Sequence, residues 1–133
     1  MSHKYLEEIN CPRIYQADMS TDEVDNRDSE WAMQRNIYGF DERETWNLGT
    51  CFYAWLYEHL KMYLDKASKI VNLDYHTFEY NGKTYTQREM IEQICEIIEY
   101  YFSDKFDDWD NNDCKYVSNI EKMWAVIMPA MWW

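Results

Sequence analysis

The chain is short, strongly acidic and rich in aromatic residues. Its 133 residues match the size of one domain, and three Gly and two Pro are too few turn-forming residues for a sandwich or barrel. We therefore expect a mainly α-helical (α+β) fold of three or more packed helices with one small β-hairpin. The net charge of -12 disfavours direct binding to nucleic acid or to an anionic membrane, and it favours a basic protein partner. The alternative is that the acidity only keeps an aromatic-rich protein soluble.

The cysteines and the apolar segments point to an intracellular protein. Cys11, Cys51, Cys95 and Cys114 are widely spaced and form no Cys-x-x-Cys pair, which disfavours a zinc site. The first residues are followed by no apolar segment typical of a secretory signal, and no apolar run reaches transmembrane length. We expect reduced thiols and predict neither a metal nor a cofactor.

The N-terminal region is predicted to differ from the rest of the chain. Residues 1–30 are expected to form an acidic arm, and residues 31–133 a single helical domain. Ser29 is predicted to cap a short helix that carries Trp31 and Met33. The acidic residues at the end of the arm are opposed by one Arg and comprise Asp18, Asp22, Glu23, Asp25, Asp28 and Glu30.

The first long helix is predicted over residues 48–67, with Asn47 as its N-cap. Apolar residues recur at steps of three and four, which is typical of a helix with one buried face. We expect Trp46 and Trp55 to be buried. The predicted apolar face comprises Leu48, Phe52, Trp55, Leu56, Leu60, Tyr63 and Ala67.

A β-hairpin and a second long helix are predicted next. The hairpin spans residues 77–85 and turns at Asn81-Gly82, a pair that tolerates positive φ at both central positions of a type I′ turn. Thr86 and Glu89 then form a capping box that begins a helix over about 87–103. Its predicted buried stripe comprises Ile91, Ile94, Cys95, Ile98, Tyr101 and Phe102.

A row of carboxylates is predicted on the exposed side of this second helix and in the segment after it. Nine acidic residues lie between positions 89 and 113, against Lys105 alone. Like charges three or four residues apart on a helix repel slightly. We predict that this row is a partner-binding surface, and the alternative is a solvated helix face. The predicted partner-binding residues are Glu92, Glu96, Glu99, Asp104, Asp107, Asp108, Asp110 and Asp113.

Part of this segment resembles a calcium-binding loop only superficially. Asp108, Asp110 and Asn112 have the spacing of the first three EF-hand ligands. The position that requires Gly holds Asp113, and the position that requires a bidentate Glu holds Asn119. Specific calcium binding is therefore not expected.

The last helix is predicted over residues 119–128. Ser118 and Glu121 have the spacing of a capping box, and Pro129 is expected to end or kink the helix. Trp124 is expected to be buried. The chain then closes on Trp132-Trp133, which indicates either docking into the protein's own core or an apolar patch for a partner.

No sequence motif predicts catalysis. His59 and His76 have no partner at the spacing of a helical metal site, and helical His residues more often pack than react. Glu42 and Glu44 precede a helix N-terminus, where carboxylates are stabilised by the helix dipole. Cys–His catalysis stays open because such partners are distant in sequence, but we predict that the protein is not an enzyme.

One short motif resembles a known group of proteins. The pattern Gly39-Phe40-x-x-x-Glu44-Thr45-Trp46-Asn47-Leu48, followed by a long helix and a closing aromatic pair, is similar to that of small bacteriophage and prophage proteins. The resemblance covers about a quarter of the chain, and this chain has Glu44 where those proteins usually have Asp. It carries over no catalytic residues. It implies a phage origin and, through that origin, a host-cytoplasm setting.

The predicted function combines this resemblance with the carboxylate row. We expect a phage-encoded inhibitor that binds a host nucleic-acid-handling defence protein, such as a CRISPR effector, through a surface that mimics nucleic acid. Duplex DNA carries one negative charge per about 1.7 Å of its axis, and a helix places successive turns about 5.4 Å apart. The alternative function is a phage accessory or assembly protein that self-associates, for example as a homodimer, through exposed aromatic residues.

Overall fold

The computed structural model of the chain describes residues 3–7, 9, 11 and 27–133. These residues group into two compact units, residues 1–56 and residues 57–133, and each unit is described here by itself. The helical fold with one hairpin, predicted from the sequence, is confirmed. The acidic arm over residues 1–30 stays a prediction, because most of it lies outside the described residues. Within the described part of the chain, no helix combines the length and the apolar character needed to cross a membrane.

The first unit is made of short helices and the beginning of a long one. The 3-10 helix η1 spans Lys4–Leu6, α2 spans Asp28–Tyr38, and the 3-10 helix η2 spans Glu42–Thr45. The prediction that Ser29 caps α2 is wrong, because the helix already begins at Asp28 and its N-cap, Arg27, makes no side-chain capping bond. The first turn instead carries two carboxylates, Asp28 and Glu30, which stabilise α2 by interacting with the positive end of its helix dipole.

Helix α3, Leu48–Lys66, links the two units and continues into the 3-10 helix η3, Ala67–Lys69. The N-cap prediction is confirmed, because the backbone N–H of Thr50 donates to Oδ1 of Asn47 at 3.1 Å. The predicted apolar face is partly wrong. Leu48 is exposed and Trp55 is 43% exposed, whereas the buried side includes Tyr53, Ala54, Leu56, Tyr57 and Leu60. Trp46, before the helix, is also exposed rather than buried.

The second unit contains the hairpin and the second long helix, as predicted. Strand β1, Thr77–Tyr80, pairs antiparallel with β2, Lys83–Thr86. Asn81 and Gly82 both have positive φ, 55° and 75°, which confirms the type I′ turn.

Helix α4 spans Gln87–Tyr101, and its first turn is closed by the predicted capping box. The Thr86 side chain accepts from the Glu89 N–H, and the Glu89 side chain accepts from the Thr86 N–H. Ile94 and Ile98 are fully buried, as expected. The buried stripe of α4 comprises Met90, Ile91, Ile94, Cys95, Ile97 and Ile98, with Phe102 beyond its end.

Two shorter helices follow. Helix α5, Asn111–Val117, was not predicted, and α6 spans Asn119–Ile127 before the 3-10 helix η4, Met128–Ala130. The end of α6 before Pro129 is as predicted. The capping box at Ser118 is wrong: its backbone is helical, with φ −61° and ψ −15°, and its hydroxyl donates to the Lys115 carbonyl. Trp124 is only half-buried.

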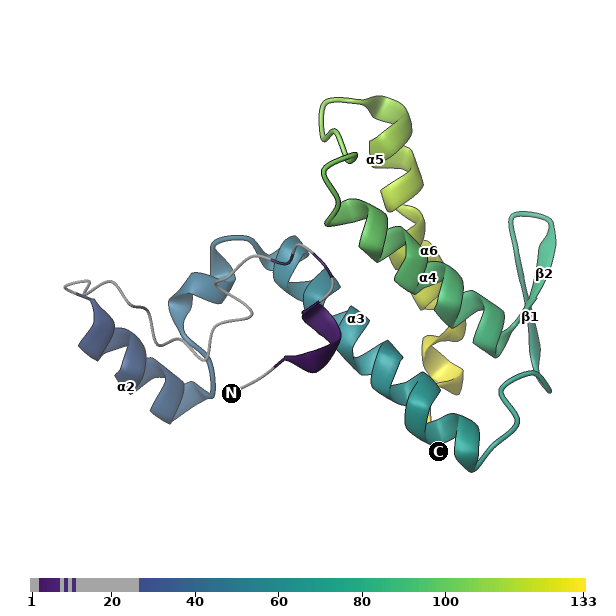
Figure 1. Cartoon of the computed structure of the whole chain (residues 1–133), viewed down its shortest axis with the longest axis horizontal. Coiled ribbons are helices and arrows are strands. Elements are labelled where there is room, and N and C mark those ends of the chain that lie inside the picture. Colours follow the sequence, from purple (N-terminus) through teal and green to yellow (C-terminus); the bar gives the residue numbers. More distant parts are fainter. Residues whose placement is uncertain (1–2, 8, 10, 12–26) are drawn as a thin grey trace. The chain divides into compact units, whose positions relative to one another are not determined.

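The core of the second unit forms where α4 is covered by its neighbours. Helices α4 and α6 lie side by side, while the hairpin contacts both of them near the beginning of α4 (Figure 1). The part of α3 from Tyr57 onward runs antiparallel to α4, because Tyr57 reaches Glu99 and Tyr63 reaches Gln87. Helix α4 is thus the central helix of this unit, and one strip of its surface remains open.

Candidate functional site

The open strip of α4 carries the first three predicted site residues. Glu92, Glu96 and Glu99 are all exposed. At about 100° per residue they fall within a narrow arc, opposite the buried stripe of the helix. Among the described residues, no Lys or Arg forms an ion pair with any of the three.

The row is bounded by aromatic side chains from α3 and α5. On one side, the Tyr57 hydroxyl donates to Oε1 of Glu99 at 2.8 Å. On the other side, α5 is held against α4 by an edge-to-face contact between Tyr100 and Tyr116, whose ring centroids lie 5.3 Å apart. Burial, and then the nearby charge of Glu96, raise the pKa of Tyr116.

The acidic segment between α4 and α5 is ordered by its own carboxylates. Asp113 is central: Oδ1 accepts from the Tyr100 hydroxyl at 2.8 Å, and Oδ2 accepts from the Asp107 N–H at 2.9 Å. Asp107 in turn accepts from the Trp109 N–H at 2.9 Å. Asp110 is the N-cap of α5 and accepts from the backbone of Asn112 at 2.7 Å and of Asp113 at 3.2 Å.

The hydrogen bond between Tyr100 and Asp113 also affects the titration of the tyrosine. Donation to Asp113, followed by burial and the nearby carboxylates, raises the pKa of the Tyr100 hydroxyl. The charged tyrosinate is disfavoured because it would face Asp113 and Asp110. The hydrogen bond from the Tyr100 hydroxyl therefore links the acidic segment to α4.

The eight predicted site residues divide into two kinds, and together they are called the acidic surface below. Four accept hydrogen bonds that hold the fold: Glu99, Asp107, Asp110 and Asp113. The other four are exposed, and their carboxylates make no hydrogen bond or ion pair with any described residue: Glu92, Glu96, Asp104 and Asp108. That all eight bind a partner stays a prediction.

One exposed residue within the acidic surface was missed. Trp109 lies between Asp108 and Asp110 and is 91% exposed. Its backbone is fixed by Asp107 and by the cap of α5, so the indole is presented from an ordered loop. An isolated Trp among five Asp could have been noticed in the sequence, since Trp is a frequent anchor of protein interfaces.

The EF-hand spacing has a different structural explanation. Asn111 onward is helical, so the second half of the would-be ligand loop is α5. Asp110, the third position of that loop, caps the helix instead. Among the described residues, no cluster of His, Cys, Asp or Glu has the geometry of a metal site.

The segment between Phe40 and Glu44 forms a buried ion pair in the first unit. Asp41 is buried and accepts from Arg43 through both Nε, at 3.0 Å, and Nη2, at 2.8 Å, and from Arg35 at 2.8 Å. The guanidinium of Arg43 lies over the ring of Trp31 at 4.1 Å. Trp46 makes an edge-to-face contact with Trp31, with centroids 6.2 Å apart. Trp46 is therefore an exposed residue that contacts the ion pair through Trp31.

The surroundings of several thiols and carboxylates affect their reactivity. Burial raises the pKa of the Cys95 thiol to about 12, so Cys95 is a poor nucleophile. Glu42 accepts from the Trp31 indole at 3.1 Å and so has a structural contact. Burial and then the charge of Asp41 raise the pKa of Glu44. Cys114 is exposed, and its thiol donates to the Asp108 carbonyl.

Comparisons of the chain with protein-family models, with curated proteins and with solved structures find no match.

Proposed function

We propose that the protein is a small phage-encoded inhibitor that binds a basic, nucleic-acid-handling defence protein of the host, such as a CRISPR effector, through the acidic surface. The observation that carries the proposal is an ordered acidic loop, tipped by an exposed Trp, that continues an open row of Glu. The phage origin comes from the motif resemblance alone.

The placement of the unpaired carboxylates opposes stability, which supports a role in binding. Glu92 and Glu96 are one turn apart and repel by a few tenths of a kcal/mol. Glu99 lies in the last turn of α4, where no basic residue offsets the negative end of the helix dipole. A surface that only kept the protein soluble would gain from interspersed Lys or Arg.

Trp109 adds an anchor to this charged surface. Interfaces dominated by charge alone gain association rate more than affinity, whereas a buried aromatic side chain contributes much of the binding energy. A basic groove that binds nucleic acid presents Arg side chains, and an Arg guanidinium stacks favourably on an indole ring. The acidic surface therefore offers both the charge and the anchor that such a groove requires.

The test compares two triple charge reversals. The test variant carries Glu92→Lys, Glu96→Lys and Asp108→Lys, all at positions without structural hydrogen bonds. The control variant carries three reversals outside the acidic surface and has the same net charge: Glu30→Lys, Asp65→Lys and Glu79→Lys.

Each protein is used to capture partners from host cells, and bound proteins are challenged with duplex DNA and with rising salt. We expect wild type and control to retain a basic nucleic-acid-binding protein that DNA releases, and the test variant to lose it. Binding should also weaken steeply with salt. Equal capture by the two triples would show that total charge, and not the acidic surface, determines binding.

A second function is favoured by one observation. Trp132 and Trp133 are 78% and 57% exposed, as expected for self-association through aromatic residues. Sedimentation at increasing protein concentration tests it: a dimer that persists in high salt and disappears in Trp132→Ser would support an accessory or assembly protein.

A further inference from the structure

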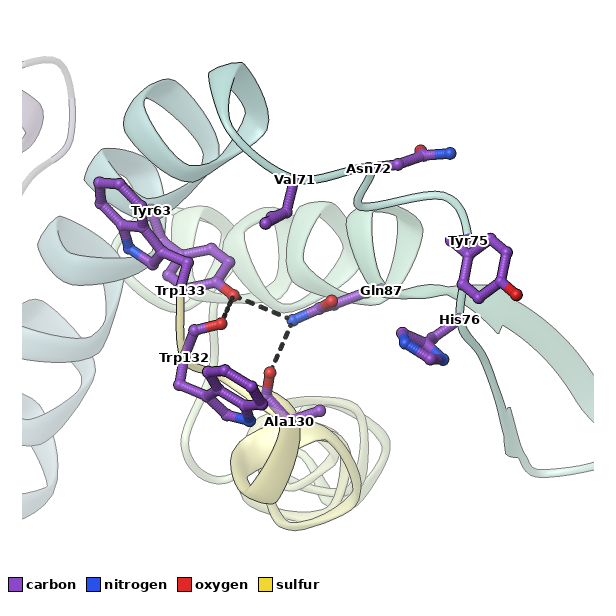
Figure 2. A pocket seen from close by; sticks show the side chains of 9 residues that line it. All are labelled: Tyr63, Val71, Asn72, Tyr75, His76, Gln87, Ala130, Trp132 and Trp133. Carbon is purple, nitrogen blue, oxygen red and sulfur yellow. Dashed lines mark hydrogen bonds between the residues drawn. The ribbon is translucent and has the colours of Figure 1, made fainter.

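A pocket opens at the end of α4 opposite the acidic loop. Its volume is about 450 Å³, within the range of small-molecule sites. Figure 2 shows its walls, which come from α3, from the segment before β1, from the first turn of α4 and from the C-terminal segment. Five of the lining side chains carry aromatic rings: Tyr63, Tyr75, His76, Trp132 and Trp133.

A buried amide lies among these rings. The side chain of Gln87 extends from α4 into the middle of the group, and the residue is only 5% exposed (Figure 2). Its Nε2 faces three acceptors, the Tyr63 hydroxyl at 3.3 Å, the Ala130 carbonyl at 3.4 Å and the Met131 sulfur at 3.3 Å. Two N–H groups shared among three acceptors leave Nε2 with no free hydrogen.

The other end of the amide has no donor. The Ala130 carbonyl can only accept, so Nε2 must face it and Oε1 must lie on the other side. No described residue donates to Oε1, and yet no fully buried side-chain oxygen or nitrogen of the described residues lacks a partner. Oε1 is therefore not fully buried, and Gln87 is one of the residues that line the pocket.

We propose that this pocket binds a small planar heteroaromatic molecule, neutral or cationic at pH 7, that carries an N–H donor on its edge. The N–H would donate to Oε1 of Gln87. The ring would stack on Trp132 or Tyr75, which are 78% and 74% exposed and so present their faces. A chain of net charge -12 disfavours an anionic ligand.

This inference does not depend on the acidic surface. Gln87 begins α4 and the acidic loop follows its end, so the two sites share no residue. Binding through ring stacking and one neutral hydrogen bond should also change little with salt.

The test uses indole and 1-methylindole, which differ in the N–H donor. Binding to the full ¹⁵N-labelled chain is followed by NMR through the Gln87 side-chain amide and the Trp132 indole signals. We expect both signals to shift with indole, and 1-methylindole to bind about three- to tenfold more weakly because its hydrogen bond is missing. Tryptamine should bind more tightly than indole-3-acetate, since the latter is an anion.

Variants separate the amide from the rings. Gln87→Met keeps the volume but removes Oε1, so indole and 1-methylindole should then bind equally. Should Gln87→Met fail to fold, Tyr75→Ala at the exposed rim serves instead and should weaken both probes. Trp109→Ala, an exposed Trp outside the pocket, is the matched control and should bind as wild type does. The proposal is overturned by absent shifts at Gln87 and Trp132, by equal affinity of the two probes for wild type, or by shifts that reflect only protein self-association.

Discussion

Replacing Asp41 by Asn tests whether the buried ion pair between Asp41 and Arg43 stabilises the first unit. The change keeps the size of the side chain but removes its charge. Arg43, whose side chain is only 6% exposed, would then lose its ion pair with this carboxylate. Asp41 also accepts from the Arg43 N–H at 3.0 Å and so caps η2.

The expected loss follows from these contacts. Removing one partner of a buried ion pair typically costs about 3–5 kcal/mol. Two features lower the cost here: Trp31 still faces the Arg43 guanidinium at 4.1 Å, and Arg35 is 29% exposed and can turn toward water. We therefore expect a loss of about 3 kcal/mol in the free energy of unfolding of the first unit.

Urea unfolding, followed by Trp fluorescence and far-UV circular dichroism, measures this loss. The control is Asp65→Asn, because Asp65 is 47% exposed and pairs with exposed Lys69 at 3.7 Å. Such surface pairs contribute about 0–1 kcal/mol. If Asp41→Asn costs no more than Asp65→Asn, the buried ion pair does not stabilise the unit.

The pH dependence gives a second check. Burial raises the pKa of Asp41, but hydrogen bonds from Arg43 and Arg35 outweigh it and hold the pKa below its ordinary value of 3.8. A carboxylate with a depressed folded pKa stabilises the protein above the unfolded pKa, and this contribution is lost as the pH falls through the folded pKa. The stability difference between wild type and Asp41→Asn should therefore be full at neutral pH and shrink below about pH 4.

Two further predictions concern the core and the thiols. Ile94→Ala should lower the free energy of unfolding in urea by about 2–5 kcal/mol, because Ile94 is fully buried. Trp55→Ala should lower it by only about 1–2 kcal/mol, because Trp55 is 43% exposed. Equal losses would contradict the burial pattern. Iodoacetamide at pH 8 should alkylate the exposed Cys114 well before Cys95, because burial raises the pKa of the Cys95 thiol to about 12. Mass spectrometry of the digested protein measures the order of labelling. Early labelling of Cys95 would mean that the core opens.

The elements that were predicted correctly have strong local signals. Asn81-Gly82 requires positive φ at two successive residues, and a type I′ turn provides it. The reciprocal bonds of Thr86 and Glu89 need only four consecutive residues, so the beginning of α4 was visible in the sequence. Neither signal depends on distant parts of the chain.

The burial errors arose where the local signal was ambiguous. Residues 51–57 are all apolar or aromatic, so periodicity could not distinguish the side with Tyr53 and Leu56 from the side with Trp55. Helix α5 was missed because it begins with Asn and Asp, which are weak helix formers. In the structure it packs on α4 through the contact between Tyr116 and Tyr100, which local sequence does not reveal. The Ser118 error has the same origin: its spacing fits a cap, but α5 leads into α6 without the extended backbone that a cap requires.

The two sites of the second unit differ in the force that would hold a ligand, and salt therefore separates them. Exposed carboxylates such as Glu92 and Asp108 act over a distance that shrinks to about 8 Å at physiological ionic strength. Gln87 would act through a hydrogen bond to the ligand in a pocket lined by aromatic rings, where added salt should change the affinity little. A protein partner released by salt while indole still shifts the Gln87 signal would assign the partner to the acidic surface and the small molecule to the pocket. Release of both the protein partner and indole by salt would instead mean that charge holds both ligands, and the proposed hydrogen bond to Oε1 of Gln87 would be wrong.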